Sequence, residues 1–185
     1  EILSGLVGSE MCIRDRSLRE KIGHDQLFLP GVTAVIVRAV PTGAAVWELP
    51  SVLLAQRADN ETWGPISGIC EPGEEITTTA LREVKEEIGL DGRVEALLGV
   101  GQVGPVVYPN GDQCTFMDTA LRVSVADGAA PIISDEENLD ARWFSVGQMP
   151  TSVSARHRMI IADAVAQMKH PQGFRPRMGY TKRNQ

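Results

Sequence analysis

The sequence has no apolar stretch approaching the roughly 20 residues that a helix needs to cross a lipid bilayer. It also has no segment with the basic start, apolar middle and small-residue cleavage site of a secretory signal peptide. From these absences we expect no membrane partner and a cytoplasmic location. The 185 residues, with ordinary apolar and charged fractions of 43% and 23%, are enough for one globular domain with a sizeable core.

Cysteine and histidine are also scarce, with three of each. The cysteines are an odd number at wide spacing, which indicates neither a disulfide framework nor a zinc-ligand cluster, so we expect free, buried thiols. The histidines, His24, His157 and His170, form no triad pattern with a nucleophile. We therefore assign them no catalytic role.

Acidic residues are missing from the end of the chain. The last 17 residues hold five basic side chains and no acidic one, although the whole chain has a formal charge of -6. The rest of the chain therefore has 13 basic against 24 acidic residues, a balance of -11. A region with this excess of acidic residues is a poor surface for binding nucleic acid. It suits a protein that attracts divalent cations. We predict no nucleic-acid partner, and we interpret residues 169–185 as a flexible basic tail.

The start of the chain contains a segment of doubtful origin. Residues 6–16 read LVGSEMCIRDR and resemble the translation of a transposase adapter used in sequencing libraries. We therefore predict that residues 1–16 are non-native, and we exclude them from the fold. Residues 17–168 are then expected to form a single domain.

Apolar patterning predicts both strands and helices. Short β-branched or extended runs predict five strands, at residues 31–37, 51–57, 94–107, 114–125 and 141–146. The dipeptide Asn110-Gly111 joins the third and fourth of these runs and is the strongest short hairpin signal that a sequence offers. Residues 154–168 carry apolar side chains at helical spacing, which predicts an amphipathic helix packed on the sheet.

A second helix is predicted between the strands. Ile76, Ala80, Val84 and Ile88 recur every four residues and form one apolar stripe. Gly89 follows at the place where a glycine ends a helix. A helix flanked by strands indicates a mixed α/β layered domain.

Three carboxylates gather on another face of this helix. Glu83, Glu86 and Glu87 are three or four residues apart, so their side chains emerge close together. Like charges at this distance repel unless solvent screens them or a cation neutralises them, and hard oxygen ligands select Mg²⁺ or Mn²⁺. A solvated acidic face is the alternative reading of these residues alone.

The whole segment 68–90, GICEPGEEITTTALREVKEEIGL, resembles the Nudix box at every specified position. The fixed residues are Gly68, Glu74, Arg82, Glu83, Glu86, Glu87 and Gly89. Residues 63–68 also resemble the approach to the box, with Ser67 in place of a glycine, and residues 142–144 resemble a late strand of the family. The resemblance covers about residues 30–168. It implies an α/β fold, the Nudix-type αβα sandwich with a mixed β-sheet between helices.

The resemblance also implies the chemistry. It implies that the chain is a Nudix hydrolase, which we expect to cleave a diphosphate linkage by metal-assisted attack of water on phosphorus. Glu86 and Glu87 match the metal-ligand pair, Glu83 matches a glutamate that acts as ligand or base, and the carbonyl of Gly68 completes the expected site for Mg²⁺, with Mn²⁺ as a substitute. These three glutamates are the predicted catalytic residues.

Two further features of the site follow from the same resemblance. Glu74 and Arg82 are expected to form a charge pair that ties the loop to the helix and supports the site. Glu83 is the first candidate for the general base, but some members of the family use an acid from a later segment. The later candidates are Asp118, Asp135, Glu136 and Glu137, among which we prefer Glu136.

The group attached to the diphosphate stays open. Substrates of the ADP-ribose or nucleotide-sugar type compete with nucleoside triphosphates. The resemblance also allows a homodimer, which is common in the family. Trp63, Tyr108, Phe116 and Trp143 are candidates to contact a base, although we expect core packing for each. One alternative is a non-catalytic nucleotide-sensing Nudix binding module. An isoprenoid diphosphate isomerase is disfavoured, because the position of its cysteine is Ser67 here.

Overall fold

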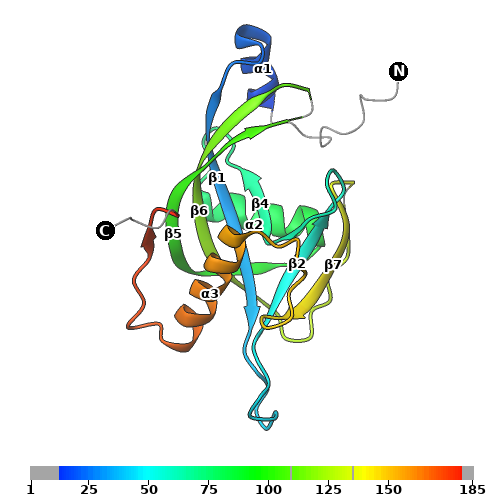
Figure 1. The fold of residues 1–185 in the computed structure, drawn as a ribbon, viewed down its shortest axis with the longest axis vertical. Coiled ribbons are helices and arrows are strands. Elements are labelled where there is room, and N and C mark those ends of the chain that lie inside the picture. Colours follow the sequence, from blue (N-terminus) through cyan, green and yellow to red (C-terminus); the bar gives the residue numbers. More distant parts are fainter. Residues whose placement is uncertain (1–12, 109, 135, 181–185) are drawn as a thin grey trace.

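The computed structural model describes residues 13–108, 110–134 and 136–180, and its fold is shown in Figure 1. The strands are β1 (Leu27–Arg38), β2 (Ser51–Arg57), β3 (Trp63–Gly64), β4 (Ile66–Ile69), β5 (Gly92–Val107), β6 (Gln113–Val125), β7 (Asn138–Ser145) and β8 (Arg177–Met178). The helices are α1 (Ile13–Ile22), α2 (Ile76–Ile88) and α3 (Ala155–Lys169). Among these helices, none is long and apolar enough to cross a membrane.

The strands form one mixed sheet in the order β3-β2-β1-β6-β5-β8, with β4 paired to β1 and β7 to β2. Strand β1 is parallel to β6 and antiparallel to β2 and β4. It therefore occupies the centre of the sheet. The box glycine Gly68 lies on β4 opposite Val32 of β1, so the central strand fixes where the box begins.

Helices α2 and α3 cover opposite faces of the sheet (Figure 1). Successive side chains of a strand point to opposite faces, so β1 contributes to two cores. Val32 packs in the cluster that contains Val84 of α2, whereas Val35 packs in the cluster that contains Ile160 of α3. This arrangement confirms the predicted αβα sandwich.

Most predicted elements are present, with small differences at their ends. Strand β2 and helix α2 have the predicted bounds, and β5 and β6 pair as the predicted hairpin. In its turn, Asn110 accepts a hydrogen bond from the backbone N–H of Asp112 at 3.0 Å, and Gly111 has a φ of +89°. This left-handed backbone explains the glycine. Elements α1, β3, β4 and β8 were not predicted, because they are short or lack a clear apolar period.

The two ends of the chain are packed on the sheet in the parts that the structure describes. Strand β8 pairs with β5, and Arg177 donates two hydrogen bonds to Asp163 of α3, at 2.8 and 3.0 Å. This packing differs from the predicted flexible tail, whose residues 181–185 lie outside the described residues. Of the predicted non-native segment 1–16, residues 1–12 lie outside the described residues. Residues 13–16 belong to α1, which begins at Ile13.

Candidate active site

Helix α2 carries Arg82 and the three glutamates of the box, and its local sequence explains its placement. Ala80, Val84 and Ile88 are fully buried against the sheet, whereas Ile76, in the first turn of the predicted stripe, is 39% exposed. The helix ends at Gly89, whose φ of 68° is left-handed and whose N–H donates to the carbonyl of Lys85 at 3.0 Å. The stripe thus fixes which way the glutamates face.

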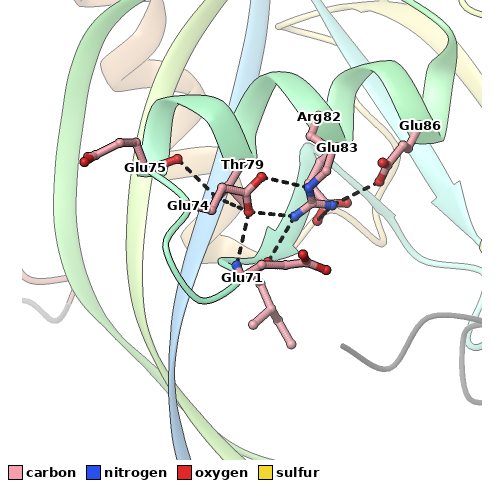
Figure 2. A network of polar contacts seen from close by, with 8 residues as sticks. Glu71, Glu74, Glu75, Thr79, Arg82, Glu83 and Glu86 are labelled. Carbon is pink, nitrogen blue, oxygen red and sulfur yellow. Dashed lines mark hydrogen bonds and ion pairs between the residues drawn. The ribbon is translucent and has the colours of Figure 1, made fainter. Parts of the chain in front are cut away.

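Arg82 organises the loop before the helix, as Figure 2 shows. Its Nε and Nη2 donate to the two carboxylate oxygens of Glu74 at 2.9 and 3.1 Å, and Nη2 also donates to the carbonyl of Ile69 at 3.2 Å. Glu74 further accepts from the hydroxyl of Thr79 at 2.8 Å and from the N–H of Glu71 at 3.1 Å. The hydrogen bonds from Arg82 are the main reason why the pKa of Glu74 is lowered to about 2. Glu74 therefore ties loop and helix together as a carboxylate.

Arg82 also neutralises part of the acidic face of α2. Its Nη1 donates to Glu83 at 2.9 Å and to Glu86 at 3.0 Å, so all five N–H groups of the guanidinium are used. One guanidinium thus contacts three carboxylates, those of Glu74, Glu83 and Glu86. The cluster keeps an excess of negative charge.

The carboxylate of Glu83 lies where a side chain on Gly68 would have to be. A Cβ built on Gly68 overlaps the Glu83 side chain, so only glycine leaves room for it there. Glu83 is 15% exposed at its side chain, and burial raises its pKa to about 7. Arg82 opposes this rise, and the charges of Glu86 and Glu137 add to it. A buried carboxylate in this setting is stabilised in its charged form by a nearby cation.

Glu87 faces a different partner. It is 7% exposed, and its carboxylate accepts a hydrogen bond of 2.8 Å from the side-chain amide of Asn138, also 7% exposed. The segment before Asn138 is tied to the end of α2, since the N–H groups of Ile132 and Ser134 donate to the carbonyls of Ile88 and Glu87 at 3.0 and 3.3 Å. The last carbonyls of a helix need such partners. This docking brings the late segment to the box.

A small pocket of about 40 Å³ opens beside Glu87. The residues that line it include Arg57, Trp63, Ser67, Glu87, Asn138 and His157. Of the four candidate aromatics, Trp63 alone lines this pocket, where its ring packs edge-on against Phe144 at 4.9 Å. The others lie elsewhere: Trp143 packs in the α2 core, Phe116 packs near α1, and Tyr108 is exposed beside the hairpin turn.

The donors fit a divalent cation by their chemistry, although their side chains do not converge on one point. Glu83 and Glu86 share Arg82, and Glu87 turns towards Asn138. Accordingly, the described ranges contain no group of three histidine, cysteine or acidic side chains placed to hold one metal ion. The excess negative charge and the buried Glu83 carboxylate nevertheless match hard oxygen ligation. Glu86 is half exposed, so its side chain is able to reorient.

The later acids are placed unequally. Asp118 lies on the α3 side of the sheet and is paired with Arg156, and Asp135 lies outside the described residues. Glu136 is exposed, whereas the charge of Glu137 contributes to the raised pKa of Glu83. The preference for Glu136 stays a prediction, and Glu137 is the later acid whose charge acts on Glu83.

The pocket is also lined by polar residues without a predicted role, among them Arg57, Asn138 and His157. Asn138 follows directly after the acidic run 135–137. Only the acidic residues of this segment were predicted as site candidates. Arg57 donates to both oxygens of Asp59, at 2.9 and 3.0 Å. His157 lies at the start of α3, and no motif in the sequence connects it to the box.

A family comparison covers most of the chain: a NUDIX domain model matches residues 30–164. The human protein named 8-oxo-dGDP phosphatase NUDT18 is 32% identical over 132 residues, which cover 66% of this chain. They cover 36% of the human protein, so the chain spans about a third of the length of that relative.

Solved structures show the same fold. The crystal structure of a UDP-X diphosphatase matches with a TM-score of 0.58 at 20% identity, over 90% of this chain and 73% of that one. The NUDIX domain of Shewanella oneidensis NrtR, solved in complex with ADP ribose, matches with a TM-score of 0.56 at 21% identity, over 78% and 89% of the two chains.

Proposed function

The chain belongs to the NUDIX family, whose members are pyrophosphohydrolases, and we propose that it hydrolyses a nucleoside diphosphate derivative with the help of Mg²⁺. In this proposal water attacks one phosphorus of a diphosphate linkage, and Mn²⁺ is able to replace Mg²⁺. The substrate is a small nucleotide-like molecule rather than a nucleic acid.

One observation carries this proposal. Glu83, Glu86 and Glu87 emerge from one helix beside Gly68, and Glu87 also lines the pocket. Because Arg82 contacts three carboxylates, the site has more negative charge than its own cation neutralises. Such a site attracts a divalent cation and, through it, a diphosphate.

The residues have separate tasks in the reaction. Glu86, Glu87 and the carbonyl of Gly68 would hold the ion, with Glu83 either as a further ligand or as the base. When bound, the ion would act as a Lewis acid that offsets the charge of the phosphate oxygens. Arg82 and Glu74 hold the loop against α2, so that Gly68 keeps its place beside Glu83.

A base must accept the proton of the attacking water. Glu83 is our first candidate, because it is largely buried and lies beside Gly68. Glu136 is the preferred later candidate, and Glu137, whose charge acts on Glu83, is its alternative. The variants Glu136→Gln and Glu137→Gln distinguish the two, because the one that loses more activity identifies the base.

The attached group belongs to a nucleotide. The human relative carries the name of an 8-oxo-dGDP phosphatase, and the structural relatives carry the names of a UDP-X diphosphatase and an ADP ribose complex. An oxidised nucleoside diphosphate is the first substrate to test, because the human protein is the most similar in sequence of these three. ADP-ribose, a nucleotide sugar and nucleoside triphosphates follow it.

The test is a screen of these compounds with the full chain and Mg²⁺ in ¹⁸O-labelled water. We expect hydrolysis of at least one compound, and the mass of the products identifies the phosphorus that water attacks. Tight binding of ADP-ribose without hydrolysis of any compound would contradict the proposal and favour a nucleotide-sensing module.

A further inference from the structure

The face of the sheet opposite α2 contains a polar network that the proposed chemistry does not use. It is centred on Asp118 of β6, which is 5% exposed. One oxygen of its carboxylate accepts from the hydroxyl of Thr33 at 2.7 Å. The other accepts from Arg156 of α3 at 2.9 Å and from the hydroxyl of Tyr180 at 2.8 Å. Four segments that are distant in the sequence therefore meet at one carboxylate.

Tyr180 closes this network from the C-terminal segment. Its ring packs against Gly101, where an added Cβ would lie 2.7 Å from a ring carbon, and its hydroxyl oxygen also lies 3.2 Å from the backbone carbonyl oxygen of Asp118. Burial, with the charge of Asp118, raises the pKa of Tyr180, so its hydroxyl stays a donor. The position of Arg156 is thus held from two sides, by Asp118 and by the Tyr180 ring 5.6 Å away.

Arg156 in turn contacts the ring of the neighbouring histidine and determines its tautomer. Its Nη2 lies 2.7 Å from Nε2 of His157. A guanidinium only donates hydrogen bonds, so Nε2 must accept, and the single proton of the neutral ring must be on Nδ1. Burial and the adjacent positive charge of Arg156 lower the pKa of His157 to about 3, which agrees with a neutral ring.

The edge of the His157 ring that carries Nδ1 faces Gly64. A Cβ built on Gly64 would lie 3.0 Å from both Nδ1 and Cε1 of His157, and both residues line the pocket beside Glu87. With about 40 Å³, the pocket has room for a single polar group rather than a whole base. A fixed donor in so small a space selects a group that accepts a hydrogen bond.

We propose that His157 is a specificity-determining residue, which donates from Nδ1 to an acceptor oxygen on the nucleoside side of the substrate, with Arg156, Asp118 and Tyr180 as its positioning residues. This inference rests on the proposed function for its substrate class. It differs from a purely structural role of the network, because it requires one tautomer and a direct contact.

The tautomer of His157 is measured first, on the protein without substrate, by a method that does not depend on enzymatic activity. In the full chain labelled with ¹⁵N-histidine, the two ring nitrogens of His157 are distinguished by NMR at neutral pH. We expect a protonated Nδ1 and a bare Nε2 in the wild type, and a shift towards the other tautomer in Arg156→Gln. A wild-type ring protonated at Nε2, or at both nitrogens, would overturn the proposal.

The contact is then measured by kinetics with Mg²⁺. The probes are 8-oxo-dGDP, ADP-ribose and UDP-glucose, compared with methyl diphosphate, which has no nucleoside. For the preferred nucleotide we expect His157→Leu to lower kcat/KM by about tenfold, mainly through KM. Hydrolysis of methyl diphosphate should stay within about twofold of the wild type, because it lacks the acceptor.

Two matched variants separate this effect from damage to the fold. His157→Asn places an amide donor near Nδ1 and should restore most of the loss, whereas His170→Leu, at an exposed histidine after α3, should change nothing. Equal losses for the nucleotide and for methyl diphosphate would contradict the inference.

Failure of the proposed function has a different signature. If the wild type hydrolyses none of the probes, that function fails, while the tautomer and a binding titration with ADP-ribose still decide the role of His157. Unchanged ADP-ribose affinity in His157→Leu would then refute the role.

Discussion

The two faces of the sheet each contain an arginine that contacts acidic side chains, but the charges balance on one face only. Under α2, Arg82 contacts the carboxylates of Glu74, Glu83 and Glu86. Under α3, in the part of the chain that the structure describes, the Asp118 carboxylate accepts from one guanidinium, that of Arg156, and from two hydroxyls. The first cluster has an excess of negative charge, and the second has none.

This difference distinguishes a cluster with uncompensated negative charge, at which we propose that a cation binds, from a cluster whose charges are balanced. Excess carboxylates that are partly buried are stabilised by a cation from outside the chain, which suits a metal-dependent reaction. A balanced pair with full hydrogen bonding is rigid and needs no ligand, which suits the positioning of a neighbour. Variants on the α2 face should therefore change metal dependence, and variants on the α3 face should change substrate affinity.

The largest effect is expected from Glu87→Gln. The amide keeps the shape of the side chain but removes its charge, so turnover should fall by more than about a hundredfold, beyond the usual effect of a residue that only supports a ligand. The melting temperature should change little. Steady-state kinetics across a Mg²⁺ series measure this, with Glu75→Gln, exposed just before the same helix, as the control. Near-normal activity of Glu87→Gln would remove the metal role of this residue.

The next effect is expected from Asn138→Ala, which removes the donor to Glu87. The carboxylate then loses its fixed orientation, and the affinity for the metal should fall by about 10- to 100-fold. A Mn²⁺ titration followed by electron paramagnetic resonance measures this affinity directly. A drop in kcat with unchanged Mn²⁺ affinity would assign Asn138 to the reaction rather than to the metal.

A pH series tests the loop contact of Glu74. The pKa of Glu74 in the folded state, about 2, is below its ordinary value of 4.5, so its contribution to stability is complete above pH 4.5 and is lost as the pH falls towards 2. The melting temperatures of the wild type and of Glu74→Gln should therefore differ at pH 7 and converge in acid. A difference that is independent of pH would show that the charge of Glu74 does not stabilise the loop.

The smallest effect is expected from Tyr180→Phe, on the balanced face. Loss of one hydroxyl that donates to Asp118 should lower the free energy of unfolding by about 1 kcal/mol. Urea denaturation measures this loss, and the Mg²⁺ dependence of any activity should stay as in the wild type. A changed metal dependence would mean that the two faces are not independent.

Local patterns were sufficient to predict the box and most of the sandwich. The spacing of Ala80, Val84 and Ile88 sets the buried face of α2. The same helical geometry places the three glutamates together on another side of the helix. Asn110-Gly111 likewise specified the hairpin through its backbone preferences. In each case the residues that determine the structure are close in the sequence.

Features that depend on distant contacts were not predictable. Asn138 reaches Glu87 because the backbone of residues 132–134 binds the end of α2, 44 or more residues earlier. Strand β8 is two residues long and has no apolar period. The ion pair between Arg177 and Asp163 could therefore not be predicted from the sequence. His157 belongs to no triad pattern in the sequence, yet in the structure its neighbour Arg156 connects it to Asp118.

We propose that the glutamates of α2 together bind a divalent cation. The most direct measurement is a Mn²⁺ titration at neutral pH, followed by electron paramagnetic resonance, of the wild type and of the Glu86→Gln, Glu87→Gln double variant. The wild type should bind Mn²⁺ in competition with Mg²⁺, and the folded double variant should lose this binding. Equal binding by both proteins, or none by the wild type at saturating metal, would contradict the account.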